Sequence, residues 1–328
     1  MEPTMFSRDV LRIDAPAVAQ EIEQAIRDQV FGTLRRRGAV VGISGGIDSS
    51  VVSTLCVRAL GKDKVLGIFM PERDTSDDAL RLGKLLAEGL GIEAVIENIK
   101  PALTGLRCYE RQDEAIRMVY PDYNESWKFK ITLPSILESD RLNVSQLTAQ
   151  PPGEEPRVKR MPLNAYLQLV AATNFKQRIR KMMEYYHADR LNYAVAGTPN
   201  LLEYDQGFFV KQGDGAADFK PIAHLYKSQV YALAEYIGVP ADIRRRAPTT
   251  DTFSMPQGQD EFYFALPYDK MDLCLYAYNN NVPAADAASA VGITPQQVER
   301  VFKDIEAKRR VAQYLHAQPL LVRDQGHA

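Results

Sequence analysis

Residues 44–50, which read SGGIDSS, combine hydroxyl groups, two glycines and one carboxylate in a spacing suited to binding phosphate. They follow the apolar run 39–43 and precede a helix-compatible run at 50–60, so we expect a turn between a strand and a helix N-terminus. Free backbone N–H groups and the helix dipole attract anions at such a point. Adjacent glycines let the backbone approach phosphate oxygens without a Cβ in the way. The segment therefore predicts a phosphate-binding turn.

The carboxylate of Asp48 lies inside this predicted turn. It would repel phosphate unless a divalent cation lay between them, so we interpret Asp48 as a magnesium ligand. The turn lacks the Gly-Lys-Ser/Thr sequence of Walker-type loops, which disfavours a kinase or GTPase acting on the γ-phosphoryl group. The alternative is a plain glycine turn capped by Asp or Ser.

Strands and helices alternate around this turn. After the first strand and helix come a strand at 65–70, a helix over 79–90 ended by Gly91, and a strand at 94–96. A further strand is expected at 193–196. This alternation predicts βαβ units with right-handed crossovers and a parallel sheet, an α/β fold.

The remaining segments are less uniform. Residues 101–169 are punctuated by Pro and Gly, and we expect an insertion or a mobile excursion there. A basic helix is expected over 174–186, a long loop that is either functional or disordered over 197–221, and a helix whose apolar stripe ends at Ile237. A last helix would begin after Thr294 as N-cap. Without repeats or a clear linker, we expect one domain over 1–328 with the insertion at about 101–169.

Composition excludes several classes of protein. The 328 residues carry a net charge of −2, too near zero for general binding to nucleic acid or anionic membranes. Neither a transmembrane run nor a signal-like start is expected, so we predict a cytoplasmic protein. The three scattered cysteines predict buried free thiols rather than disulfides, and the four dispersed histidines are not expected to be catalytic.

At this point the motifs resemble a known family. SGGIDSS is similar to the signature of the N-type ATP pyrophosphatases, which use ATP to adenylate a carboxylate or carbonyl oxygen and release pyrophosphate. GTPNLLE at 197–203, GFFVKQGDGAAD at 207–218 and Pro221 resemble the second block of the ammonia-using NAD synthetases. The resemblance covers about 40–100 and 174–310. It implies a doubly wound parallel sheet flanked by helices, a Rossmann-like fold of the adenine nucleotide alpha hydrolase type.

The resemblance also implies residue roles. ATP would be bound by Gly42, Ile43, Ser44, Gly45, Gly46, Ile47, Asp48, Ser49, Thr198, Lys227 and Thr249. Magnesium would be held by Asp48 and Glu203, and deamido-NAD, the nicotinic acid adenine dinucleotide, by Arg178, Lys211, Asp218 and Lys308. Members of the family commonly have a His-Lys pair where this chain has Ala307-Lys308. Asp214 would lie near the nicotinate carboxylate or the incoming ammonia, and we expect Asp48 and Asp214 to be the catalytic residues.

The residues support these roles to different degrees without the resemblance. Lys227 begins a helix, where a cation opposes the dipole, so a phosphate partner would explain its position; an exposed lysine is the alternative. Glu203 alone could be a solvated loop carboxylate. Arg178 can bind phosphate or carboxylate with two N–H groups, whereas Lys176, Arg180 and Lys181 could form a solvated face.

The predicted reaction joins deamido-NAD and ammonia, with ATP, to give NAD, AMP and pyrophosphate through an acyl-adenylate. We hypothesise that Asp214 binds ammonium and accepts its proton. Ammonia would come from solution or from a separate protein, and the family implies a homodimer. Two alternatives stay open: another amide ligase of the superfamily acting on a different carboxylate or carbonyl, and a non-catalytic adenine-nucleotide sensor. The presence of both Asp48 and Glu203 argues against the sensor.

Overall fold

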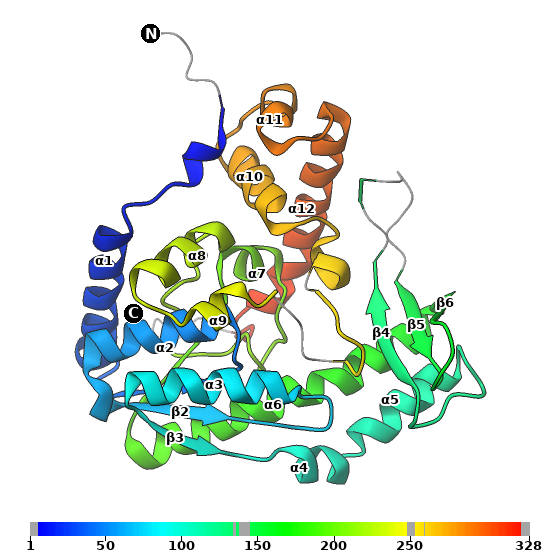
Figure 1. The fold of residues 1–328 in the computed structure, drawn as a ribbon, viewed down its shortest axis with the longest axis horizontal. Helices are drawn as coiled ribbons and strands as arrows, with labels where there is room; N and C mark the ends of the chain where they lie inside the picture. Colours follow the sequence, from blue (N-terminus) through cyan, green and yellow to red (C-terminus); the bar gives the residue numbers. More distant parts are fainter. Residues whose placement is uncertain (1–5, 134–135, 138–144, 248–252, 259, 323–328) are drawn as a thin grey trace.

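The centre of the protein is a parallel four-stranded sheet (Figure 1). The computed structural model describes residues 6–133, 136–137, 145–247, 253–258 and 260–322. The strands lie in the order β3-β2-β1-β7, with β1 at Ala39–Gly42, β2 at Val65–Phe69, β3 at Glu93–Ile96 and β7 at Ala194–Ala196. Ala39 lies opposite Val65 on one side and Ala194 on the other.

Helices cover both faces of this sheet. Successive residues of a strand point to opposite faces, so Val41 packs with α1 (Ala15–Arg27), α2 (Ile47–Leu60) and α8 (Lys227–Tyr236), and Val40 packs against α6 (Leu163–Leu191). Both faces are apolar because both are buried, as is usual for parallel sheets. The expected doubly wound α/β fold is therefore confirmed.

Further helices complete the molecule. They are α3 (Asp77–Leu90), α4 (Lys100–Gly105), α5 (Cys108–Arg117), α7 (Leu201–Gln206), α9 (Ala241–Arg245), α10 (Tyr268–Asn279), α11 (Ala284–Val291) and α12 (Pro295–His316). Short turns of other helical types lie at Arg8–Leu11, Asp28–Thr33, Lys62–Lys64 and Asp260–Phe264. Thr294 caps α12 in a capping box, and Gly91 ends α3 in the left-handed conformation, as expected.

The segment 101–169, expected to be an insertion or a mobile excursion, is regularly folded in its described part. It holds α4, α5, the beginning of α6, and an antiparallel sheet of β4 (Lys128–Thr132), β5 (Gln146–Gln150) and β6 (Arg157–Arg160). An aromatic core that includes Trp127 and Phe129 lies beneath this second sheet. α6 extends from it to the parallel sheet (Figure 1). The expected loop at 197–221 also contains a helix, α7.

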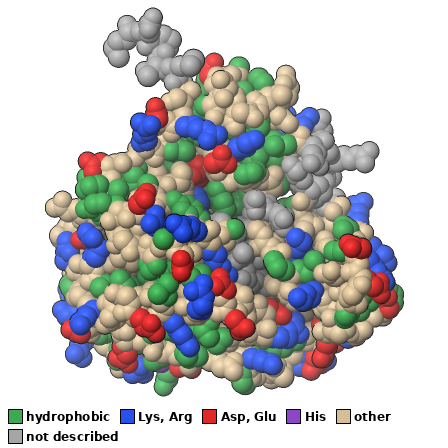
Figure 2. All heavy atoms as spheres, viewed as in Figure 1, with side chains coloured by type: hydrophobic (Ala, Val, Ile, Leu, Met, Phe, Trp, Pro, Cys, Tyr) green, Lys and Arg blue, Asp and Glu red, His purple; other side chains and the backbone are tan. Residues whose placement is uncertain are grey.

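The surface carries mixed charge. Figure 2 shows Lys and Arg side chains interspersed with Asp and Glu over the displayed face, in keeping with the net charge of −2. Among the described helices, none combines the length and the apolar character that crossing a bilayer requires.

Candidate active site

The strand order reverses between β1 and β7. From β1 the chain continues outward through β2 to β3, and it later returns to place β7 on the other side of β1. In open α/β sheets ligands bind beyond the carboxyl ends of the strands at such a switch point. A cavity of about 550 Å³ lies here, lined by the turn after β1, by the segment after β7, and by α6.

Hydroxyl groups fix the turn after β1. The amide of Gly46 donates to Ser44 Oγ (3.2 Å), and the hydroxyls of Ser49 and Ser50 donate to the Gly46 carbonyl (3.1 and 2.7 Å). Helix α2 begins at Ile47, and within the described chain no side chain caps its first amides. These N–H groups remain available to an anion, so the geometry agrees with the predicted phosphate-binding turn.

Glycine is required in this turn for steric reasons. Gly45 has a φ of 75°, and a Cβ there would lie 2.2 Å from the carbonyl oxygen of Ala79. At Gly42, a Cβ would lie 2.7 Å from Glu184 Oε1. A side chain at position 45 would therefore require the backbone of α3 to move, and one at position 42 would displace the Glu184 carboxylate of α6.

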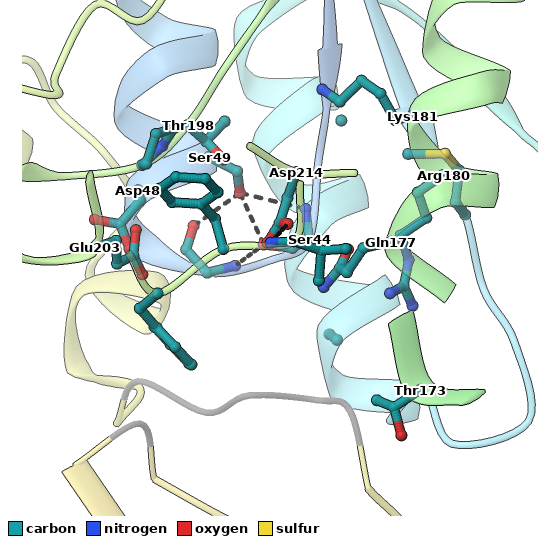
Figure 3. Close-up of a pocket in the computed structure, with 18 of the residues that line it drawn as sticks. Ser44, Asp48, Ser49, Thr173, Gln177, Arg180, Lys181, Thr198, Glu203 and Asp214 are labelled. Carbon is teal, nitrogen blue, oxygen red and sulfur yellow. Dashed lines mark hydrogen bonds between the residues drawn. The ribbon is translucent and has the colours of Figure 1, made fainter. Parts of the chain in front are cut away.

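Asp48 and Glu203 lie on the same side of the cavity (Figure 3). Asp48 forms an ion pair with the buried ammonium of Lys227 and accepts a hydrogen bond from Asn200 Nδ2 (3.2 Å). Asn200 is also the N-cap of α7, in a capping box in which its backbone amide donates to Glu203 Oε2 (3.2 Å). One residue, Asn200, thus connects the two carboxylates predicted to hold magnesium, through its side chain to Asp48 and through its backbone amide to Glu203.

The electrostatics of this cluster favour a cation. Burial, and then the negative charge of Asp48, raise the pKa of Glu203 to about 8, although Lys227 opposes the shift. Burial alone would lower the pKa of Lys227, but Asp48 and Glu203 outweigh it and raise that pKa. Magnesium in phosphate sites is held by one or two carboxylates together with phosphate oxygens. Within the described chain no cluster of three or more His, Cys, Asp or Glu ligands exists, so this two-carboxylate donor set fits magnesium only together with ATP.

Helix α6 contributes a polar stripe to the cavity that our sequence analysis missed. Figure 3 shows Thr173, Gln177, Arg180 and Lys181, and Glu184 also lines the cavity. Apart from the neighbours Arg180 and Lys181, these residues lie three or four positions apart, the period of one helix face. Lys181 Nζ lies 2.5 Å from Glu184 Oε2, and both side chains are buried. The spacing of these polar residues was the signal that could have identified them.

The solvated basic face considered for α6 is wrong at two positions. Besides Lys181, Lys176 is fully buried and pairs with Glu72 Oε1 (3.0 Å) and Asp74 Oδ2 (2.6 Å). Nearby charges of Lys176 and Arg73 overcome the effect of burial and lower the pKa of Asp74. The basic residues of α6 therefore divide among a buried ion network, the cavity and the surface.

Asp214 lies at the cavity, where its Oδ1 accepts a hydrogen bond from the Val210 amide (2.7 Å). Burial raises the pKa of Asp214, while the Val210 amide and the charges of Lys181 and Arg180 reduce the shift. This placement agrees with a role at the reacting carboxylate, and the bond to Val210 gives Asp214 a second role in shaping its own turn.

The four residues expected to bind deamido-NAD do not line this cavity. Lys211 Nζ donates to the carbonyls of Tyr314 (2.8 Å) and Ala317 (3.1 Å) at the end of α12, and Arg178 Nε donates to the Lys211 carbonyl (3.3 Å). Asp218 Oδ2 accepts a hydrogen bond from the Val195 amide (2.7 Å), and Lys308 Nζ forms an ion pair with Asp304 Oδ2 (2.5 Å).

The remaining predicted residues are placed as follows. Thr198 lines the cavity together with Gly42, Ile43, Ser44, Gly46, Ile47 and Ser49, and Gly45 lies within the same turn. Thr249 lies outside the described residues. The three cysteines are buried and free, as expected. Of the described histidines, none lines the cavity; His187, for example, contacts Glu97 Oε1 (2.7 Å) instead.

Comparisons with known proteins agree with this geometry. The profile of the family described as NAD synthase matches residues 18–122 and 154–312 and leaves 123–153 unmatched. A protein of Mesorhizobium japonicum named NH(3)-dependent NAD(+) synthetase is 62% identical over 95% of this chain and 98% of its own length. One of the same name from Rhizobium rhizogenes is 56% identical over 97% and 96%.

A solved structure shares the fold. It is the NH3-dependent NAD synthetase of Campylobacter jejuni in complex with nitrate, with a TM-score of 0.62 at 23% identity over 95% of this chain and all of that one. The extent of the profile match and the identity to full-length relatives lead to one conclusion: this chain belongs to the NAD synthase family.

Proposed function

We propose that this protein amidates the nicotinate carboxylate of deamido-NAD with ammonia, using ATP and releasing AMP and pyrophosphate. The observation that carries the proposal is the placement of a phosphate-binding turn and the carboxylates of Asp48 and Glu203 around one cavity. The names of the relatives, of which this chain covers nearly the full length, support the same activity.

The first step forms a bond between a nicotinate oxygen and the α-phosphorus of ATP and breaks the bond to pyrophosphate. A carboxylate is already nucleophilic, so this step depends on positioning and on neutralising charge. The amides at the start of α2 and the hydroxyls of Ser44 and Ser49 would bind phosphate oxygens. Asp48 and Glu203 would hold magnesium, which supplies positive charge to the phosphates when bound. The ion pair with Lys227 keeps Asp48 oriented.

In the second step the lone pair of ammonia attacks the acyl carbon, and AMP leaves with the electrons of the broken C–O bond. The nitrogen must lose protons on the way from ammonium to the amide. Asp214 is the carboxylate at the cavity suited to binding ammonium and accepting a proton, because its raised pKa brings it closer to that of a useful base.

The binding site for the rest of deamido-NAD would include Arg178, Lys211, Asp218 and Lys308, outside the cavity lining. We propose that a homodimer completes it. The exposed apolar side chains of Met182, Tyr186 and Tyr314, which are 56%, 57% and 71% exposed, support an interface near these residues. The enzyme would act in the cytoplasm on ammonia from solution or from a separate protein.

An incubation with ATP, magnesium, deamido-NAD and an ammonium salt, followed by chromatography of AMP and NAD, tests the activity. We expect AMP and NAD in equal amounts. AMP without NAD would indicate a ligase for a different acceptor, and no turnover would indicate a nucleotide sensor. Replacing ammonium with glutamine should abolish NAD formation.

The metal site has its own test. Glu203→Gln should raise the magnesium concentration needed for half-maximal activity at least tenfold, because one charged ligand is lost. Glu299→Gln, an exposed position on α12, is the matched control and should leave the magnesium requirement unchanged. An unchanged requirement in Glu203→Gln would contradict the assignment.

A further inference from the structure

We propose that strand β4 positions one wall of the cavity, formed by Phe208, Phe253 and Phe262. It does so by binding residues 253–257 along the outer edge of β4. Residues 123–153, which the family profile leaves unmatched, contribute both β4 and β5 to the second sheet. Ser254 and Phe129 are then positioning residues that do not themselves line the cavity. The importance of this wall for catalysis rests on the proposed function.

The edge of β4 is available for this contact. In the order β4-β5-β6, β4 pairs with β5 on one side only. An edge strand presents a row of N–H and C=O groups that can bind another segment. In β4 these groups at Phe129 and Ile131 point the same way, because alternate residues of a strand face the same side.

Residues 253–257 contact β4 through backbone and side-chain hydrogen bonds, one of which runs from Lys130 Nζ to the Pro256 carbonyl (3.5 Å). The Phe129 amide donates to Ser254 Oγ (2.9 Å), and the Met255 amide donates to the Phe129 carbonyl (3.1 Å). Farther along, the side-chain amide of Gln257 donates to the Ile131 carbonyl. Residues 253–257 are in neither a helix nor a strand of their own, so their polar groups depend on such external partners.

Aromatic packing extends this contact to the cavity. Phe253 packs edge-on against Phe129 of β4, with ring centroids 5.6 Å apart, and against Phe262 at 5.4 Å. Phe262 in turn packs against Phe208 at 5.8 Å. Phe253, Phe262 and Phe208 all line the cavity, whereas Phe129 is fully buried in the core of the second sheet.

This wall therefore connects the second sheet to the segment that carries Asp214. Phe208 lies in the same GFF segment that leads to Asp214. If β4 released residues 253–257, Phe253 would lose its support and the packing behind Phe208 would loosen. Small displacements of groups that orient reactants reduce rates strongly, so β4 should affect the reaction without touching substrate.

Two variants that each remove one hydroxyl group separate positioning from stability. Ser254→Ala removes the acceptor of the Phe129 amide, at the contact between β4 and the wall. Tyr120→Phe removes the donor to the carbonyls of Arg157 (2.8 Å) and Leu147 (3.3 Å), within the second sheet and its core. Ser254→Thr keeps a hydroxyl and serves as the rescue variant.

We expect Ser254→Ala to lower kcat/KM for NAD formation about three- to tenfold, Tyr120→Phe to stay within twofold of wild type, and Ser254→Thr to recover most of the loss. Hydrogen exchange provides a second readout. The Met255 amide should be protected in the wild type and should exchange faster in Ser254→Ala, with the amides of the parallel sheet unchanged.

Three results would overturn the proposal. They are equal kinetics of Ser254→Ala and Tyr120→Phe, faster exchange at Met255 with unchanged kinetics, and an unprotected Met255 amide in the wild type. If the wild type formed no NAD, the proposed function would fail, whereas exchange at Met255 would still decide whether β4 holds this segment.

Discussion

The ammonium group of Lys227, the first residue of α8, forms an ion pair with the carboxylate of Asp48 in the first turn of α2. A cation at a helix N-terminus is unfavourable, and Asp48 offsets this cost in the present structure. The pair also fixes the Asp48 side chain at the start of α2, together with the hydrogen bond from Asn200. The contact between Lys227 and ATP remains a prediction.

Asp48→Asn keeps the volume of the side chain and removes its charge. We expect NAD formation to fall at least a hundredfold, because the proposed magnesium ligand beside the transferring phosphate would be lost. We expect the melting temperature to fall because Lys227 is left buried without its Asp48 partner. Asp286→Asn, in the exposed first turn of α11, is the control and should behave as wild type. A near-normal rate in Asp48→Asn would rule out its role as a metal ligand.

Asp214→Asn should slow amide formation more than adenylation. The amide oxygen of Asn can still accept the hydrogen bond from Val210, so the turn is preserved while the proposed proton acceptor is lost. Single-turnover measurements of pyrophosphate release and NAD formation separate the two steps, and we expect at least a tenfold larger effect on NAD. Asp189→Asn at the exposed end of α6 should change neither step. Equal losses in both steps would count against Asp214 as the proton acceptor.

Gly45→Ala should disrupt the phosphate-binding turn. The new methyl group would meet the Ala79 carbonyl at 2.2 Å, so backbone must move in addition to the cost of a positive φ. Gly292→Ala has a similar φ of 73° and no atom within 4 Å of the added Cβ, so it isolates the cost of φ alone. In urea unfolding we expect Gly45→Ala to be less stable than Gly292→Ala by more than about 1 kcal/mol, and only Gly45→Ala to lose ATP binding. Equal free energies of unfolding for the two variants would show that the turn accommodates the added methyl group without any further loss of stability.

The thiols should be unreactive in the folded protein. Burial raises the pKa of Cys56 and Cys274 to about 12 and that of Cys108 to about 11. A raised pKa keeps the thiol protonated, so at pH 8 at most about one thiol in a thousand is the reactive thiolate. A chromogenic disulfide reagent at pH 8 should detect no thiol in the native protein and three after unfolding. One rapidly titrating thiol in the native protein would contradict this burial.

The parts of the fold that follow from local sequence were predictable. The strand at Ala39–Gly42, the glycine turn and the N-cap at Thr294 each depend on a few adjacent residues, and all are present as expected. The second sheet was missed although Phe129 and Ile131 alternate with polar residues, because the alternation covers only one short strand. Its partner strands lie far enough along the chain that local patterns do not show the pairing.

The site was predictable where motifs define it and not where tertiary packing does. The turn after β1, Thr198, Glu203 and Asp214 all lie at the cavity. Lysine is usually solvated, so nothing in the sequence around Lys176 shows that Glu72 and Asp74 lie close enough to bury it. Those two carboxylates follow β2, about a hundred residues earlier in the chain.

The cavity joins residues made early and late in protein synthesis. The turn predicted to bind phosphate contributes residues from Gly42 onward, and Val311 and Leu315 of α12 contribute another part of the cavity wall. A ribosome-bound chain that has already formed β1 and α2 still lacks that wall. The lining of the cavity is therefore complete only once α12, the last helix of the described residues, has left the exit tunnel.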